Sequence, residues 1–257
     1  MFPLTHILLA IAAAFFAGAI NSIAGGGTLV TFPTLMFLGL PAVTANATST
    51  VAIWPGSLGS MWGFRHEIRR IPLRMKLLAI PSVLGGLAGA WLLRSTPAGV
   101  FEKLVPYLIL FATLLFTIQA PVQKRLQSIL TQGKRGGLWV AGAFIAQLGV
   151  GVYGGYFGAG MSIMMLTALA FMGMEDILEM SALTSFLSFC TNGVASGLFI
   201  AAHMVVWPYV LVMMVSALLG GWTAARIAKQ VKKTTVRRFV IGVGVTIGIV
   251  LLIRTSL

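Results

Sequence analysis

The stretch NSIAGGGTLVTFP, from Asn21 to Pro33, lies inside an apolar run that extends from Leu4 to Phe64 without a charged residue. Three adjacent glycines each cost about 1 kcal/mol relative to alanine in a helix interior, so a helix is predicted to break at Gly25 to Gly27. The stretch GVGVYGGYFGAGMS at residues 149–162 interrupts a second long apolar run in the same way. The pieces flanking each break are about 20 and 12 residues long, and the shorter one cannot cross a hydrocarbon core of about 30 Å. Each break is therefore predicted to form a hairpin that enters the membrane and returns.

Composition supports a membrane location for the whole chain. Of the 257 residues, 58% are hydrophobic and 9% are charged, whereas soluble domains carry roughly 25% charged residues. The length allows about eight to ten membrane segments and leaves no room for a soluble catalytic domain. The apolar stretches are continuous, so the predicted class is an all-α polytopic membrane protein and a β-barrel is disfavoured. The segment GLPAVTANATST (Gly39 to Thr50) is expected to interrupt the first run again.

Several kinds of chemistry are excluded or disfavoured by residue counts. A single cysteine, Cys190, cannot form an intrachain disulfide, and three histidines and five acids make a metal site hard to build. No nucleophile with a paired base stands at a usable spacing. The formal charge of +13 comes from basic residues between apolar runs, which is unlike the basic face of a nucleic-acid-binding domain. We therefore expect no enzyme, no cofactor, no metal and no nucleic-acid partner.

Matching residues recur at a spacing of 134 residues, without gaps, for more than sixty residues. Internal self-similarity of this kind indicates homologous repeats. The chain is therefore predicted to contain a first repeat at 1–120, a basic linker at 121–137 and a second repeat at 138–257. The matched pairs include Gly26 with Gly160, Gly39 with Gly173, Thr50 with Thr184, Gly59 with Gly193, Gly63 with Gly197, Ser82 with Ser216 and Gly86 with Gly220.

The positive charges predict the orientation of the repeats. Fifteen of the 18 basic residues fall within residues 65–76, 124–135 and 226–238, which the positive-inside rule places in the cytoplasm. Because the loops at 124–135 and 226–238 are both predicted to be cytoplasmic, the chain between them must cross the membrane an even number of times. The segments 180–206 and 210–225 supply two crossings, so the stretch 138–174 must begin and end on the same side. Each repeat then has a hairpin and three spans, so the repeats insert with opposite orientation, as in many secondary transporters. Both termini are predicted to be periplasmic, and symmetry alone places the first hairpin.

The two breaks are the predicted binding site. In inverted-repeat transporters, substrates bind near the midplane at helices interrupted in corresponding positions. Helices that start after the breaks would present free N–H groups and positive dipole ends to an anion, and glycine amides could add a concave nest. The alternatives are that the glycines serve packing and that the hydroxyls bond back to their own helix. Gly59/Gly63, Gly85/Gly89, Gly193/Gly197 and Gly244/Gly248 are predicted packing pairs.

The residues NSIAGGGTLVTFPTLMFLGLPAVTANATSTVA (Asn21 to Ala52) resemble the first-repeat signature of the TauE/SafE sulfite exporter family, also called the TSUP permeases. The second-half stretch GVYGGYFGAGMSIMMLTAL (Gly151 to Leu169) is similar to the second-repeat motif of that family. The resemblance covers essentially the whole chain. Many members have adjacent glycines where this chain has Phe157 to Met161, so the second half-site is expected to be tighter or differently shaped.

The resemblance implies an inner-membrane transporter that moves sulfite, sulfonates such as sulfoacetate, or thiosulfate, usually outward. The passive anion channel and the thiosulfate or sulfonate uptake permease stay open as alternatives, and H⁺ or Na⁺ coupling is undecided. The partners expected are a small anionic substrate and the lipid bilayer. The candidate binding residues, from the breaks and from the motif, are Asn21, Ser22, Gly25, Gly26, Gly27, Thr28, Asn46, Thr48, Ser49 and Thr50 in the first repeat, and Tyr153, Gly154, Gly155, Tyr156, Gly158, Gly160, Ser162, Thr184 and Asn192 in the second.

Overall fold

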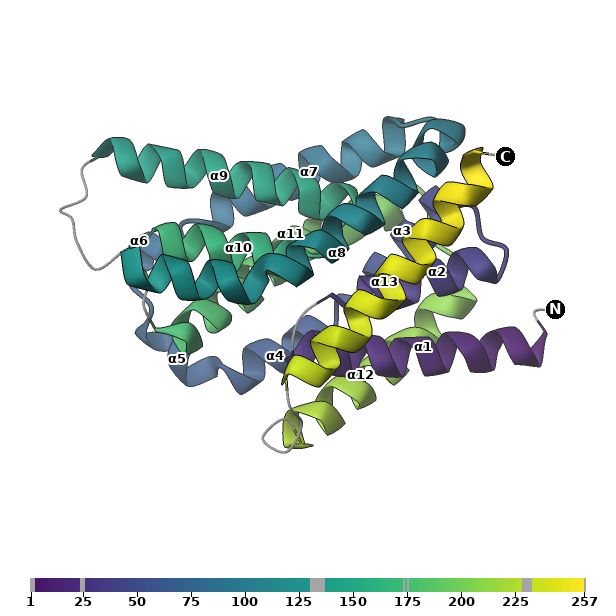
Figure 1. Cartoon of the computed structure of the whole chain (residues 1–257), viewed down its shortest axis with the longest axis horizontal. Helices are drawn as coiled ribbons and strands as arrows, with labels where there is room; N and C mark the ends of the chain where they lie inside the picture. The colour runs from purple at the N-terminus through teal and green to yellow at the C-terminus, as the bar shows by residue number, and fades with distance from the viewer. Residues whose placement is uncertain are drawn as a thin grey trace.

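The structure is a computed structural model that describes residues 3–23, 26–129, 137–172, 174, 176–227 and 233–256. Within these residues the chain is all-helical and contains no strand (Figure 1). The helices are α1 (Leu4–Ile23), α2 (Thr28–Phe37), α3 (Ala42–Ile53), α4 (Gly56–Gly63), α5 (Arg65–Arg70), α6 (Leu73–Lys76), α7 (Ala79–Ser95), α8 (Ala98–Ile129), α9 (Gly137–Tyr156), α10 (Met161–Phe171), α11 (Ile177–Ala201), α12 (Trp207–Ile227) and α13 (Lys233–Ser256).

Both predicted helix breaks are present. The 20-residue helix α1 ends at Ile23 and the 10-residue helix α2 begins at Thr28. The 20-residue helix α9 ends at Tyr156 and the 11-residue helix α10 begins at Met161. At about 1.5 Å of rise per residue, α2 and α10 are each roughly half as long as a hydrocarbon core is thick.

The prediction that residues 39–50 interrupt the helix is wrong over most of that segment. Only residues 38–41 interrupt it, at a turn where Gly39 has a φ of +91°. The polar residues that follow lie in helix α3, where the Thr50 hydroxyl donates to the Asn46 carbonyl at 2.9 Å. Such back-bonding lets a hydroxyl satisfy itself without breaking the helix. A break at Pro55, which was not predicted, separates α3 from α4 because proline has no N–H to donate.

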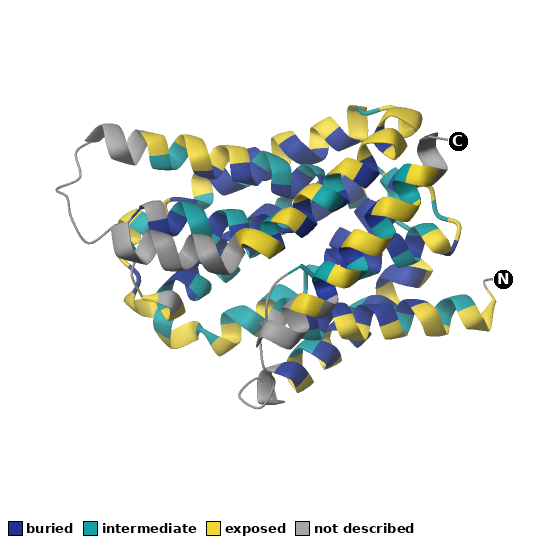
Figure 2. Cartoon of the chain, in the orientation of Figure 1, coloured by how far each residue is buried: buried dark blue, intermediate teal, exposed yellow. Residues whose placement is uncertain are grey.

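Within the described residues, five helices are long and apolar enough to cross a membrane, and the chain is a multi-pass membrane protein. Their outward faces carry large exposed apolar side chains, such as Tyr107, Phe111 and Leu114 of α8, whereas the facing surfaces are buried (Figure 2). An apolar exterior matches the lipid it contacts. The candidate spans are Leu4–Asn21, Leu73–Ser95, Ala98–Ile118, Leu178–Ala201 and Trp207–Ala224.

Two close helix pairs organise the bundle: α1 packs on α12, and α7 packs on α9. The α7–α9 contact depends on Gly85 and Gly89, which approach the backbone carbonyls of α9 so closely that a Cβ would collide with them. The predicted packing role of this pair is confirmed, since small residues allow such backbone approach. The same prediction is wrong for Gly59 and Gly63 of α4, which have nothing within 4 Å of a Cβ position.

Different segments of the chain lie at the two ends of the molecule. The beginning of α1, the end of α13 and the α7–α8 turn lie at one end in Figure 1, while α5, α6 and the beginning of α9 lie at the opposite end. Two clusters of buried apolar residues fill the space between. One joins α2, α3, the α9–α10 break and α12, and the other joins α9, α10 and α11 with the segment around Ile71. The helix breaks therefore lie inside packed protein.

Candidate functional site

The two helix breaks lie against the same stretch of α8. Gly26 has a φ of +90°, and a side chain at this position would collide with the ring of Phe116. Gly160 has a φ of +80°, and its Cβ position is 3.5 Å from Ala112. Because Ala112 and Phe116 are about one helical turn apart on α8, the breaks converge at one depth in the bundle. Both glycines adopt a left-handed conformation that other residues reach only at a cost.

The first break is closed by the side chain of Asn21, near the end of α1. Its Oδ1 accepts a hydrogen bond from the Gly27 N–H at 2.7 Å. The Leu29 N–H donates to the Gly26 carbonyl at 3.0 Å, so the start of α2 already uses two of its donors. Gly27 also packs tightly against the Ala17 backbone. This break is therefore a capped helix start. Thr28 is buried there, while Gly25 and the side chain of Ser22 lie outside the described residues.

In the second break, the closing side chain donates a hydrogen bond instead of accepting one. The Tyr153 hydroxyl donates to the Ala159 carbonyl at 2.5 Å, so this side chain satisfies an acceptor. Gly158, with a φ of +79°, and Gly160 turn the chain into α10. The Ser162 N–H, in the first turn of α10, has no hydrogen-bond partner among the described residues. This break therefore retains a backbone donor at a helix N-terminus, where a negative charge is favoured.

Polar residues of α3 connect the breaks to their surroundings. The Asn46 Nδ2 donates to the Tyr156 carbonyl at 2.9 Å, which joins the first half of the chain to the second break. The Oδ1 of the same side chain is buried without a partner among the described residues. Thr48 Oγ1 accepts from the Val206 N–H at 3.1 Å. An unpartnered buried amide oxygen is costly, so it marks a position where a hydrogen-bond donor such as water would be stabilised.

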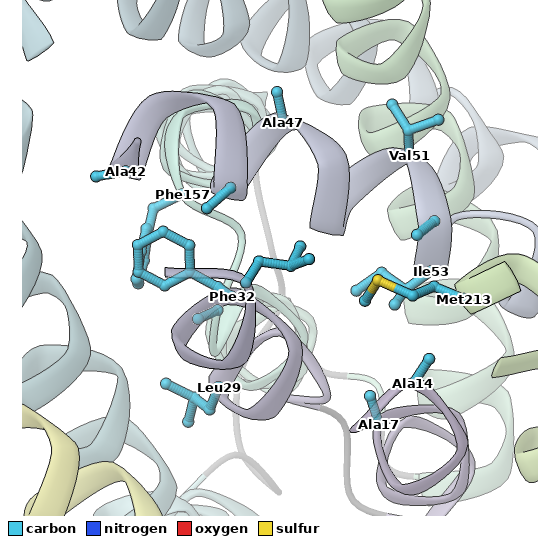
Figure 3. Packing of buried hydrophobic residues seen from close by; sticks show 14 of the residues in the cluster. Ala14, Ala17, Leu29, Phe32, Ala42, Ala47, Val51, Ile53, Phe157 and Met213 are labelled. Carbon is cyan, nitrogen blue, oxygen red and sulfur yellow. The ribbon is translucent and has the colours of Figure 1, made fainter. Parts of the chain in front are cut away.

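A second α3 contact ties the short helix α2 in place. The hydroxyls of Ser49 and Thr31 are 2.6 Å apart and form a buried hydrogen bond. The rings of Phe32 on α2 and Phe157 in the second break meet edge to face, with centroids 5.4 Å apart. Figure 3 shows these two rings close together beside the start of α3. The second break thus packs directly on the short helix that follows the first break.

Other candidate residues have different surroundings. Gly155 approaches the Gly86 carbonyl of α7, and Gly154 abuts the Met161 side chain, so both have a packing explanation. The Tyr156 hydroxyl is 3.5 Å from Thr96 Oγ1, beyond the end of α7. On α11, the Thr184 Oγ1 is buried without a partner among the described residues, and Asn192 is half-buried. No hydrogen bond among the described residues joins these last two to a break.

Two further residues, Ala112 and Phe116, were not predicted. They are apolar residues in an apolar helix, so no sequence signal distinguishes them from lipid-facing neighbours. The side chains around both breaks are neutral amides, hydroxyls and aromatics. Among the described residues, no group of three or more His, Cys, Asp or Glu could hold a metal ion. This arrangement can bind a small polar ligand through backbone dipoles and hydrogen bonds, with no fixed opposite charge.

The chain is similar to known proteins over most of its length. A family model described as sulfite exporter TauE/SafE matches residues 10–251. A probable membrane transporter protein of Haemophilus influenzae is 30% identical over 88% of this chain and 87% of its own length. Probable membrane transporter protein ORF9 of a Sinorhizobium species is 28% identical over 93% and 90%, and YfcA of Escherichia coli K12 is 27% identical over 94% and 88%. No solved structure matches significantly.

Proposed function

Because the chain belongs to the TauE/SafE sulfite exporter family, we propose that it is a secondary transporter that exports small sulfur-containing anions across the bacterial inner membrane. Sulfite, sulfoacetate and other organosulfonates are the proposed substrates. They bind between the two helix breaks, and the site opens alternately to the two sides of the membrane. Transport itself fits the relatives, whose names describe probable membrane transporters.

The convergence of Gly26 and Gly160 on α8 is the observation that carries this proposal. It brings together two short helices whose N-termini favour negative charge. A site made of neutral donors binds an anion weakly enough to release it, as transport requires. The Ser162 N–H is the clearest available donor.

We further propose that the halves, residues 1–120 and 138–257, are inverted repeats, each with a re-entrant hairpin. The register of the two main helix contacts supports this proposal. In the α1–α12 pair, Gly220 packs against the Phe15 carbonyl. The 134-residue offset maps Gly220 onto Gly86 of α7 and Phe15 onto Gly149 of α9. On each helix, the mapped residue lies one position after the residue that makes a contact in the α7–α9 pair. That contact joins Gly85 to the Leu148 carbonyl.

A second contact follows the same rule. Gly18 packs against the Ala217 carbonyl between α1 and α12. The 134-residue offset maps Gly18 onto Val152 and Ala217 onto Val83. Each mapped residue again lies one position after the residue that makes a contact in the α7–α9 pair, here Gly151 with Ser82. Unrelated helix pairs have no reason to share a register in this way. The agreement supports one packing unit used twice, with the long helix before each break placed on a later helix of the other half.

Labelling would test the proposed topology. In a Cys190→Ala background, cysteines at His66 and Arg238, both exposed, should react with an impermeant maleimide from the cytoplasmic side. A cysteine at Pro97 in the α7–α8 turn should react from the periplasmic side. Reaction of the first two positions from opposite sides would rule out the inverted arrangement.

Flux would test the proposed activity. Proteoliposomes should move labelled sulfite or sulfoacetate faster than empty liposomes, with saturation and counterflow. Gly142→Ala is a suitable control variant, because a Cβ at Gly142 meets nothing within 4 Å. Flux that neither saturates nor shows counterflow would identify a channel, and flux equal to that of empty liposomes across sulfur anions would contradict the proposed substrate class.

A further inference from the structure

The segment from α4 to α6 carries an exposed cationic surface that the transport site does not use. Its members are four exposed arginines: Arg65, Arg69, Arg70 and Arg74. None of them forms an ion pair with a carboxylate in the part of the chain that the structure describes. Helices α5 and α6 lie at the end of the molecule opposite the start of α1 (Figure 1), and the residues of the segment are mostly exposed or intermediate (Figure 2). We refer to these four arginines as the arginine surface.

The arginine surface stands on a firmly packed base. Ile71 is buried, and Phe64, Ile68 and Met75 pack with it against the apolar cluster of α10 and α11. The arginines therefore project from an amphipathic segment whose apolar side is held by the protein. Burial on one side fixes the positions of the guanidinium groups on the other. Such a surface can recognise a ligand with less ordering cost than a mobile loop.

Exposed apolar side chains border the arginine surface. Leu58, Trp62, Leu73 and Leu77 are all exposed. Arg65 donates to the Trp62 carbonyl at 3.0 Å, and its guanidinium carbon is 5.5 Å from the centre of the Trp62 ring. Tryptophan and arginine side by side, with leucines beyond them, are typical of a segment at the boundary between headgroups and acyl chains. The candidate span that begins at Leu73 continues directly from it.

The corresponding part of the other half lacks this surface. The 134-residue offset places residues 65–76 opposite residues 199–210, which include the α11–α12 turn and contain no lysine or arginine. The difference shows that the fold does not require arginines at this position. The positive-inside rule places such arginines on the cytoplasmic side, which is also the side where anionic lipids give the membrane a negative surface potential.

We propose that the arginine surface binds the phosphate groups of anionic phospholipids in the bilayer around the protein. A guanidinium group matches a phosphate with two parallel hydrogen bonds, and basic residues at a membrane surface are attracted to anionic lipids. Because the base of the segment packs on α10 and α11, bound lipid also stabilises the second hairpin. The proposal does not depend on which anion the protein transports.

Native mass spectrometry of the delipidated full-length protein in detergent provides the test. Phosphatidylglycerol should bind at least about fivefold more than phosphatidylcholine. Replacing all four arginines by glutamine should remove the preference. Changing Lys124, Arg125, Lys134 and Arg135 to glutamine removes the same charge and should preserve most of it. If the first variant does not fold, the four-lysine variant keeps the charge and should bind phosphatidylglycerol with intermediate preference.

Three results would overturn the proposal. The first is equal binding of the two lipids by the unmodified protein. The second is displacement of phosphatidylglycerol by millimolar inorganic phosphate, which would indicate a site for free phosphate. The third is stronger retention of an acidic poly-glutamate peptide than of the lipid, which would indicate a protein partner. A melting temperature raised by phosphatidylglycerol in the unmodified protein and unchanged in the four-glutamine variant would support it independently.

Discussion

The two helix breaks share a backbone shape and differ in how each is closed. Gly26 and Gly160 stand 134 residues apart and have nearly the same φ, +90° and +80°. In the first break, Asn21 accepts a hydrogen bond from a backbone N–H, so a donor is used up. In the second, Tyr153 donates to a carbonyl, so an acceptor is used up and the Ser162 N–H stays available. From this difference in closing side chains we propose that the second break contributes more to anion binding than the first.

The largest effect is expected at Gly26, which has a positive φ like its counterpart Gly160 in the second break. Gly26→Leu should reduce flux to the level of empty liposomes, because the position needs a positive φ and a side chain there would strike Phe116. Gly39→Leu is the matched control: Gly39 has a φ of +91°, but nothing lies within 4 Å of its Cβ position. A non-glycine residue in this conformation costs about 1–2 kcal/mol, so both variants lose stability. Equal flux in the two variants would remove the shared-site interpretation.

The next effect separates the two breaks. Ser162→Pro removes the unpartnered N–H in the first turn of α10, where proline is tolerated. A hydrogen bond to a charged group contributes about 1.5–3 kcal/mol, so the half-saturating anion concentration should rise about tenfold or more. The same change at Thr28 should raise it less if the second break holds the anion. A larger effect at Thr28 would reverse the assignment of the two breaks.

A smaller effect tests the cap of the first break. Asn21→Ala should lower the free energy of unfolding by about 1 kcal/mol, since it removes an N-cap-like acceptor for the Gly27 N–H. Asn21→Asp keeps the acceptor and adds a negative charge near the proposed anion path. Its melting temperature should stay near that of the unmodified protein while anion flux falls. Undiminished flux in Asn21→Asp would show that the first break lies away from the transported charge.

The smallest effect, which is confined to stability, is expected at the tyrosine that closes the second break. Tyr153→Phe removes the hydrogen bond to the Ala159 carbonyl and should cost about 1 kcal/mol of stability. The rings that surround Tyr153, Phe111 and Phe157, would still pack on the phenylalanine. Thermal unfolding with and without sulfoacetate checks this. A complete loss of ligand stabilisation would indicate that the hydroxyl contacts the ligand.

The positions of the breaks could be predicted because glycine clusters are incompatible with a continuous helix. Composition was sufficient for the all-helical membrane class, and the motif at Asn21 to Ala52 was sufficient for the family. The extent of α3 was predicted wrongly, because the whole segment from Gly39 to Thr50, including Asn46, Thr48 and Ser49, was expected to interrupt the helix. In the structure they remain helical: Ser49 bonds to Thr31 of α2, whereas Asn46 and Thr48 bond to backbone groups of the second half.

The contents of the site were harder to predict for a physical reason. A glycine sequence does not show whether an amide is free or already bonded, and Gly27 is bonded to Asn21 while Gly155 packs on Gly86. Ala112 and Phe116 enter the site only because α8 passes both breaks. Both residues are more than fifty residues away from the first break in the sequence, so no local sequence pattern encodes this contact.

Ligand protection is the most direct test that one anion binds between the two breaks. Thr28→Cys and Ser162→Cys, each in a Cys190→Ala background, are labelled with N-ethylmaleimide in membranes at increasing sulfoacetate or sulfite concentrations, and the melting temperature confirms that each variant is folded. We expect one of these anions to slow labelling at both positions, with saturation at the same concentration. Labelling at either position that no sulfur anion changes would contradict it.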